Sequence, residues 1–207
     1  MAQLRMQGHR VLVADLANET IRAITGSMIA YDGPVTFKNA GMGGGDGFKA
    51  AFKRKMTGES LSLMEVTGSG TVYFAVDAQD ITILELTNDT MHVEASQLLA
   101  LVGQLRTDVK FSGLRGATSG QGLFTTTVTG TGTIALLSAG GPIIALEVSP
   151  QFPLVVDPDA FVAFHGQLNQ TFVTDVTWRS AIGGGNGEAF SLRFDGQGLV
   201  YIQPEER

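Results

Sequence analysis

The sequence predicts an all-β protein in which one domain contains three related units. The first observation is that GESLSLMEVTGSGTVYFAV at 58–76 recurs as GQGLFTTTVTGTGTIALLS at 120–138, with seven of the first fourteen positions identical. The second is a shorter version, GEAFSLRFDGQGLVYI, at 187–202. The third is the presence of 27 glycines among 207 residues, because glycine supplies the positive φ angles that many tight turns need.

A second element recurs between these copies and sets the boundaries of the units. Residues 90–103 align with 152–166, and residues 20–31 are a more distant relative. The aligned positions are Glu94 with Asp157, Ala100 with Ala163, Gly103 with Gly166, Thr20 with Thr90 and Ala30 with Ala100. The alternating order predicts units at about 10–76, 77–138 and 139–204, arranged around a pseudo-threefold axis. The alternative is that glycine-rich β sequences resemble one another through composition alone.

The recurring glycines are predicted to be structural turn residues. Each copy contains Gly-x-Gly about ten residues after its first glycine, which is the pattern of two strands closed by a tight turn. The predicted turn residues are Gly58, Gly68, Gly70, Gly120, Gly130, Gly132, Gly187, Gly196 and Gly198.

Two segments need a decision between helix and strand. Residues 94–105 have good helix propensity, but the aligned stretch contains Pro158 and several β-favouring residues, so we predict a strand for both. Residues 47–56 instead carry apolar side chains at helical spacing, which predicts one short amphipathic helix.

Composition limits the classes of protein that the chain can represent. With 43% hydrophobic and 16% charged residues, a globular protein is expected rather than a disordered one. The net charge of -6 argues against nucleic acid as the main partner. The chain has no cysteine, no targeting segment and no apolar run near the roughly 18 residues of a membrane span. These features predict a protein of the cytoplasm with no transmembrane segment.

The chemistry-bearing residues form no motif of a known catalytic or cofactor site. The glycine cluster at 41–48 lacks the Gly-Lys-Ser/Thr ending and the preceding strand of a nucleotide loop, and the cluster at 183–187 has no helix after it. His9, His92 and His165 do not form a repeated ligand set, because His92 aligns with Arg22 and His165 with Val102. The carboxylates are scattered as well. We therefore predict no catalytic, cofactor or metal residues, although an acid/base or oxygen-ligand pair assembled by the fold stays open.

The basic stretch is the most distinctive charge feature. Lys49, Lys53, Arg54 and Lys55 lie within seven residues of an acidic chain and are the candidate partner surface. A helix that caps the β body with solvated cations is the simpler interpretation, and peripheral membrane contact is a further one.

These residues also carry a family resemblance. The stretches GGGDGFKAAFKRKMTGESLSL and GQGLFTTTVTGTG, with a final GEAF and GLVYIQP, resemble the bacterial branch of the altered-inheritance-of-mitochondria family, protein twenty-four. The resemblance covers nearly the whole chain, and the sequence departs from it at Gln121, where Glu is more typical. It implies three repeats like those of the tryptophan RNA-binding attenuation protein (TRAP-like, related to double-stranded β-helix or β-sandwich folds) and a family of unknown function, whose mitochondrial members are associated with inner-membrane organisation.

Three classes of function follow in order of preference. A non-catalytic scaffold or assembly protein, with a protein partner or self-association, fits the β surface and the lack of a concentrated polar site. A small-ligand binder of TRAP-like fold is the alternative, although a fold alone does not establish a ligand. An enzyme is the least favoured class.

Overall fold

The computed structural model describes residues 2–39, 61–112, 123–173 and 191–205, and these residues form one antiparallel β sheet of 12 strands. The strands are β1 (Gln3–Gln7), β2 (Val11–Ile24), β3 (Met28–Asp32), β4 (Val35–Asn39), β5 (Leu63–Phe74), β6 (Asp80–Glu94), β7 (Leu98–Ser112), β8 (Leu123–Ser138), β9 (Ile144–Val148), β10 (Leu154–Val156), β11 (Phe161–Val173) and β12 (Ser191–Ile202). Two short 3-10 helices, η1 (Ala95–Gln97) and η2 (Pro158–Ala160), interrupt them. The predicted all-β class is confirmed.

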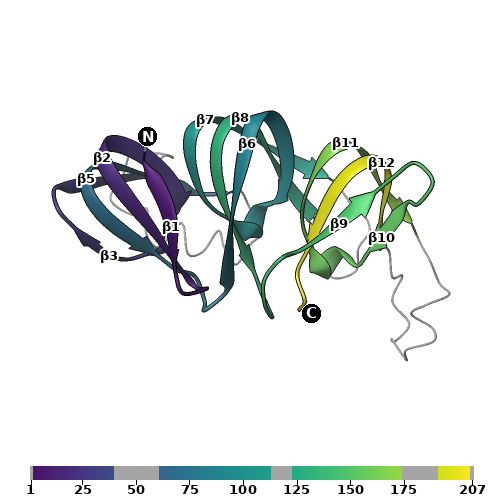
Figure 1. The fold of residues 1–207 in the computed structure, drawn as a ribbon, viewed down its shortest axis with the longest axis horizontal. Coiled ribbons are helices and arrows are strands. Elements are labelled where there is room, and N and C mark those ends of the chain that lie inside the picture. Colours follow the sequence, from purple (N-terminus) through teal and green to yellow (C-terminus); the bar gives the residue numbers. More distant parts are fainter. Residues whose placement is uncertain (1, 40–60, 113–122, 174–190, 206–207) are drawn as a thin grey trace.

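The strands form three groups that follow one another along the longest axis of the molecule (Figure 1). Each group has a long central strand, which is β5, β8 or β12. On one side, the central strand pairs with what we call the first flank, which is β2 in group one, β6 in group two, and β9 and β10 in group three. On the other side, it pairs with the second flank, which is β3 and β4 in group one, β7 in group two and β11 in group three. Strand β1 adds to β2 in the first group.

The three groups also share the register of their strand pairs. On the first flank, the aligned pairs are Arg22 with Glu65, His92 with Thr127 and Val155 with Arg193. On the second flank, they are Ala30 with Tyr73, Ala100 with Ala135 and Ala163 with Tyr201. A register shift comes just before each of these alanines, between Met28/Ala30, Leu98/Ala100 and Phe161/Ala163. The three groups share this pairing scheme, and the predicted three repeats around a pseudo-threefold axis stay a prediction.

The predicted glycine turns are wrong for the glycines that the structure describes. Gly68 and Gly70 lie inside β5, Gly130 and Gly132 inside β8, and Gly196 and Gly198 inside β12, and each of these strands is continuous. At all six positions an added Cβ would collide with a backbone carbonyl of the second-flank segment. The glycines thus permit close approach of two backbones within a sheet, which is a second reason for glycine in a strand.

The strand predicted for residues 94–105 holds with one local exception. Residues 98–105 belong to β7, and 95–97 form η1. The aligned segment behaves in the same way, with η2 followed by β11. The aligned acids have the same role, because the Glu94 and Asp157 side chains accept hydrogen bonds from the backbone N–H of Ser96 and Asp159 at 2.7 and 3.0 Å.

The core consists of three apolar clusters, and two of them cross the boundaries between groups. One cluster joins side chains of β2 and β5 to Leu99, Ala100 and Leu137 of the second group. Another reaches from Leu63 in β5 to Val162 in β11. The third lies within the last group around Phe161 and Phe194. Since burial of apolar area is the main favourable term in folding, the contacts between groups are part of the core.

Candidate functional site

The predicted partner surface cannot be placed, because Lys49, Lys53, Arg54 and Lys55 lie outside the described residues, as do Gly58, Gly120, Gly187 and the helix expected over 47–56. The structure instead brings together polar side chains at the junction between the second and third groups. The sequence shows no motif in these strands and leaves open only that the fold assembles an acid/base pair.

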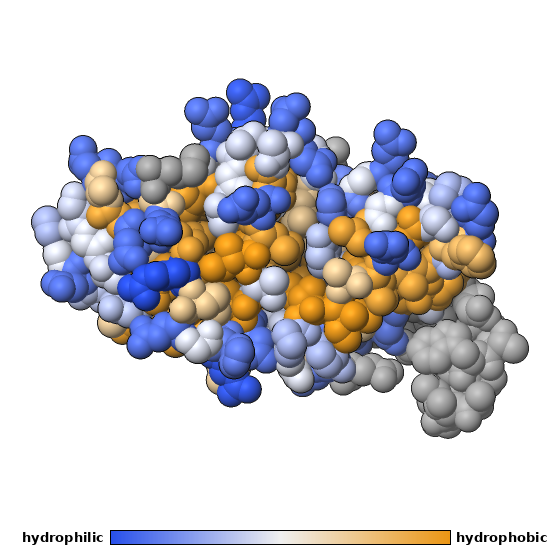
Figure 2. Space-filling view, viewed as in Figure 1, coloured by the Kyte–Doolittle hydropathy of each residue, from blue (hydrophilic) through white to orange (hydrophobic). Residues whose placement is uncertain are grey.

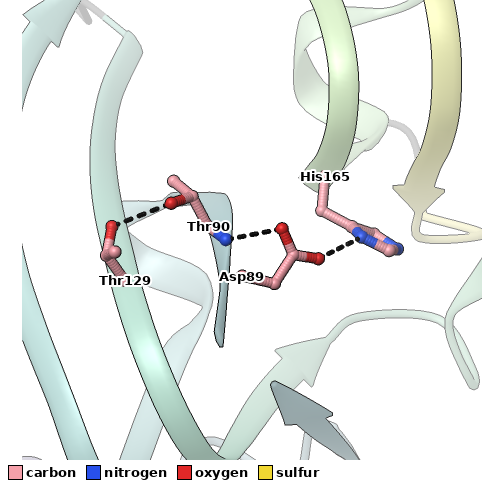
Figure 3. A network of polar contacts seen from close by, with 4 residues as sticks. All are labelled: Asp89, Thr90, Thr129 and His165. Carbon is pink, nitrogen blue, oxygen red and sulfur yellow. Dashed lines mark hydrogen bonds and ion pairs between the residues drawn. The ribbon is translucent and has the colours of Figure 1, made fainter. Parts of the chain in front are cut away.

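The centre of this junction is a histidine–aspartate pair (Figure 3). His165 Nδ1 on β11 lies 3.1 Å from Asp89 Oδ2 on β6. Asp89 Oδ1 accepts a 2.7 Å hydrogen bond from the backbone N–H of Thr90, and the Thr90 hydroxyl lies 3.1 Å from that of Thr129 on β8. An ionised carboxylate only accepts hydrogen bonds, so the proton of this contact belongs to Nδ1 of His165.

Aromatic contacts hold the imidazole rings at the junction. His165 stacks on Tyr201 of β12 with ring centroids 5.8 Å apart, and His92 stacks on Phe164 at 4.5 Å. Burial raises the pKa of Tyr201, and the nearby Asp89 carboxylate raises it further. The Tyr201 hydroxyl is therefore a neutral group at physiological pH.

Strand pairing explains why these residues meet. The second and third groups join where Met91, His92 and Val93 of β6 pair with His165, Phe164 and Ala163 of β11. A bulge precedes this segment on β6, where Asn88 has a φ of 51° and the β6–β8 register shifts between Leu86 and Asp89. The bulge places Asp89 beside the end of the pairing, within reach of His165.

The equivalent junction between the first two groups uses different chemistry at the same position. There Arg22 and Ala23 of β2 pair with Leu101 and Ala100 of β7. Arg22 stands where His92 stands, and its guanidinium donates to the Leu105 carbonyl at 2.5 Å and to the Thr107 hydroxyl at 3.5 Å. Both junctions thus use a nitrogen-bearing side chain on the first flank to meet the second flank of the next group.

The His165–Asp89 pair could hold and orient a proton, and its partial exposure, with 27% of the His165 and 48% of the Asp89 side chain accessible, leaves it open to a polar ligand. Within the ranges that the structure describes, no group of three or more histidines and acids could hold a metal ion. The His165–Asp89 pair connects β11 of the third group to β6 of the second, so its observed role is to hold these two groups together.

Two other carboxylates of the described chain have structural contacts elsewhere. Asp80 pairs with Arg10 at 3.4 Å, and Asp157 caps η2. Sequence reasoning missed the His165–Asp89 pair because 76 positions separate its members. The alignment of His92 with Arg22 marks a position that recurs at each junction, but it does not point to His165 or Asp89.

Comparisons with known proteins agree with this architecture. The family model described as mitochondrial biogenesis AIM24 matches residues 3–205. The chain belongs to this family. The resemblance read from the sequence is thereby confirmed, and the function of the AIM24 family is unknown.

A solved structure supports the fold across the whole chain. The crystal structure of a Streptococcus pyogenes protein superposes with a TM-score of 0.74, at 23% sequence identity, covering 100% of this chain and 94% of that one. At this identity the likeness concerns the fold alone. No curated protein matches the chain. Within the described residues, no helix is long and apolar enough to cross a membrane.

Proposed function

We propose that this member of the AIM24 family is a non-catalytic β scaffold of the cytoplasm that works by binding protein chains. The proposal rests on the positions of the exposed large apolar side chains in the described chain. Five of six lie on, or just before, strands with one neighbour in the sheet: Ile29 and Tyr31 on β3, Ile144 on β9, Val155 on β10, and Phe152. Exposed apolar groups on a sheet edge favour association with another chain.

Crosslinking mass spectrometry on the full chain in native lysate tests this function. The expected result is a reproducible protein complex with crosslinks near the two ends of the strand row. Native mass spectrometry of the purified protein provides the opposing readout. A retained small molecule, together with no protein complex, would instead favour the ligand-binding alternative.

The basic stretch is a second proposed contact surface. Lys53→Glu combined with Lys55→Glu should leave the melting temperature nearly unchanged, because exposed charges contribute little to stability. The same change should weaken binding to an acidic partner in a salt-dependent manner. Phe52→Ala is the matched packing variant, with an expected loss of about 3 kcal/mol of unfolding free energy if residues 47–56 dock on the β body. Equal loss of stability in both variants would contradict the surface role.

A further inference from the structure

Two junctions inside the molecule each pair the first flank of one group with the second flank of the next. The two ends of the row of groups carry one flank of each kind. The first flank of group one (β2) pairs with the second flank of group two (β7), and the first flank of group two (β6) pairs with the second flank of group three (β11). Group three therefore ends in a first flank (β9 and β10), and group one ends in a second flank (β3 and β4). Each of these four strands pairs only with its own central strand in the part of the chain that the structure describes.

Burial at equivalent positions shows that one junction is unfilled. In β7, Leu99, Ala100 and Leu101 are 0 to 1% exposed, because the first group covers them. In β11, Val162, Ala163 and Phe164 are 0 to 6% exposed at the same positions. In β3, the equivalents are Ile29 at 56%, Ala30, which is also exposed, and Tyr31 at 52%. The same three-residue segment is thus buried in two groups and exposed in the other.

The first flank of group three has the matching surface. Val155 and Val156 of β10 hold the positions that Arg22 and Ala23 hold in β2 and that His92 and Val93 hold in β6, as their pairing with the central strands shows. Val156 is buried like Ala23 and Val93, whereas Val155 is 44% exposed. Figure 2 shows apolar surface continuing over the β9–β12 group at this end of the row.

We propose that a second copy of this chain fills the junction, with β10 of one copy pairing with β3 of the next. The register follows from the two internal junctions: Val155 lies opposite Tyr31, and Val156 lies opposite Ala30. Tyr31 and Val155 are both apolar, and neither carries the charge that protects many edge strands from pairing. The contact is heterologous, since different surfaces meet, so repetition gives a ring or an open chain of copies. This inference rests on the proposed scaffold function and names its partner.

Engineered cysteines test the register without background, because the chain contains no cysteine. Opposite residues of an antiparallel pair have Cα atoms about 4.5 to 5.5 Å apart, which is within the range that a disulfide spans. A mixture of Tyr31→Cys and Val155→Cys chains should form a disulfide-linked dimer under mild oxidation, while either variant alone should not. Glu85→Cys, at an exposed site on β6, mixed with Val155→Cys is the matched control.

Sedimentation of the full chain over a range of concentrations provides the second measurement. Tyr31→Glu should raise the dissociation constant between copies roughly tenfold or more, because burying an unpaired carboxylate opposes association. Circular dichroism checks that this variant is folded. Crosslinking no greater than in the control mixture, equal self-crosslinking of either variant alone, or a monomer at every concentration would overturn the proposal. A monomer that still forms complexes with other proteins would leave the scaffold function standing and remove self-assembly.

Discussion

Gly130 shows how a single missing Cβ shapes this sheet. It has a φ of 133°, and an added Cβ would meet the carbonyl oxygen of Gln104 on β7. Two costs therefore add for any other residue, one from the backbone angle and one from the collision. Gly8 shares only the first, since it has a φ of 67° with nothing within 4 Å of the added atom.

Gly130 and Gly8 together give a matched prediction for stability. Gly130→Ala should lower the unfolding free energy by about 3 kcal/mol or more, since strain and collision act together. Gly8→Ala should cost about 1 kcal/mol, from backbone conformation alone. Urea unfolding of both variants measures the difference. Equal losses of unfolding free energy would show that β7 and β8 move apart at Gly130 at no cost. The close approach of Gly130 to the Gln104 carbonyl would then not contribute to stability.

Asp15 gives a pH dependence with a defined sign. Its pKa lies below the ordinary value because Arg5 donates to it at 2.8 Å and the Thr71 hydroxyl does so as well. A carboxylate with a lowered folded-state pKa stabilises the fold above its unfolded pKa, near 4, and the contribution is lost as pH falls through the folded value. The pair is largely exposed, so the effect is small.

The measurement compares the melting temperatures of wild type and Asp15→Asn. The wild type should be the more stable protein at pH 6, and the difference should shrink toward zero at about pH 2. Arg5→Met removes the main cause of the shift and should flatten the wild-type dependence. A difference that grows on acidification would contradict the assignment.

At the scale of elements, η1 and η2 are short, and their caps should matter. Asp157→Ala removes the oxygen that accepts from the Asp159 N–H at 3.0 Å, so we expect a loss of about 1 kcal/mol. Asp159→Ala is the control, because the contacts of this residue with Asp157 and Gln203 use its backbone atoms. Chemical denaturation of the two variants measures the loss. Similar stability of both would show that the cap is dispensable.

The elements also show what the sequence could predict. Strand at 98–105 was predictable because the aligned segment contains Pro158 and aromatic residues, which oppose a helix. The glycine turns were wrong because a turn and a close approach of two strands both require glycine. Only the position of the Gln104 carbonyl, 26 residues from Gly130 (130 minus 104), distinguishes the two cases. The His165–Asp89 pair was invisible for the same reason, since strand order decides which distant residues meet.

For the whole molecule, the apolar clusters predict cooperative unfolding. The cluster that contains Leu63 and Val162 spans all three strand groups, so no group can unfold without exposing part of its neighbour's core. Scanning calorimetry should show one transition with equal calorimetric and van't Hoff enthalpies. Ala163→Asp would place a charge at a fully buried junction position and should separate the third group into a transition of its own. Two transitions in the wild type would contradict this coupling.

The residues at the equivalent junction positions have a further consequence. Arg22 meets a backbone carbonyl and a hydroxyl, His92 stacks on a ring, and Val155 is an aliphatic side chain. Groups with one pairing scheme risk docking in the wrong order while the chain folds, as neighbouring repeats do in other proteins. A guanidinium docked against Phe164 would lose its acceptors, and a valine docked beside Leu105 would leave that carbonyl unsatisfied. The two junctions within the chain therefore differ in the contacts that Arg22 and His92 satisfy, which favours docking of each group with its own neighbour.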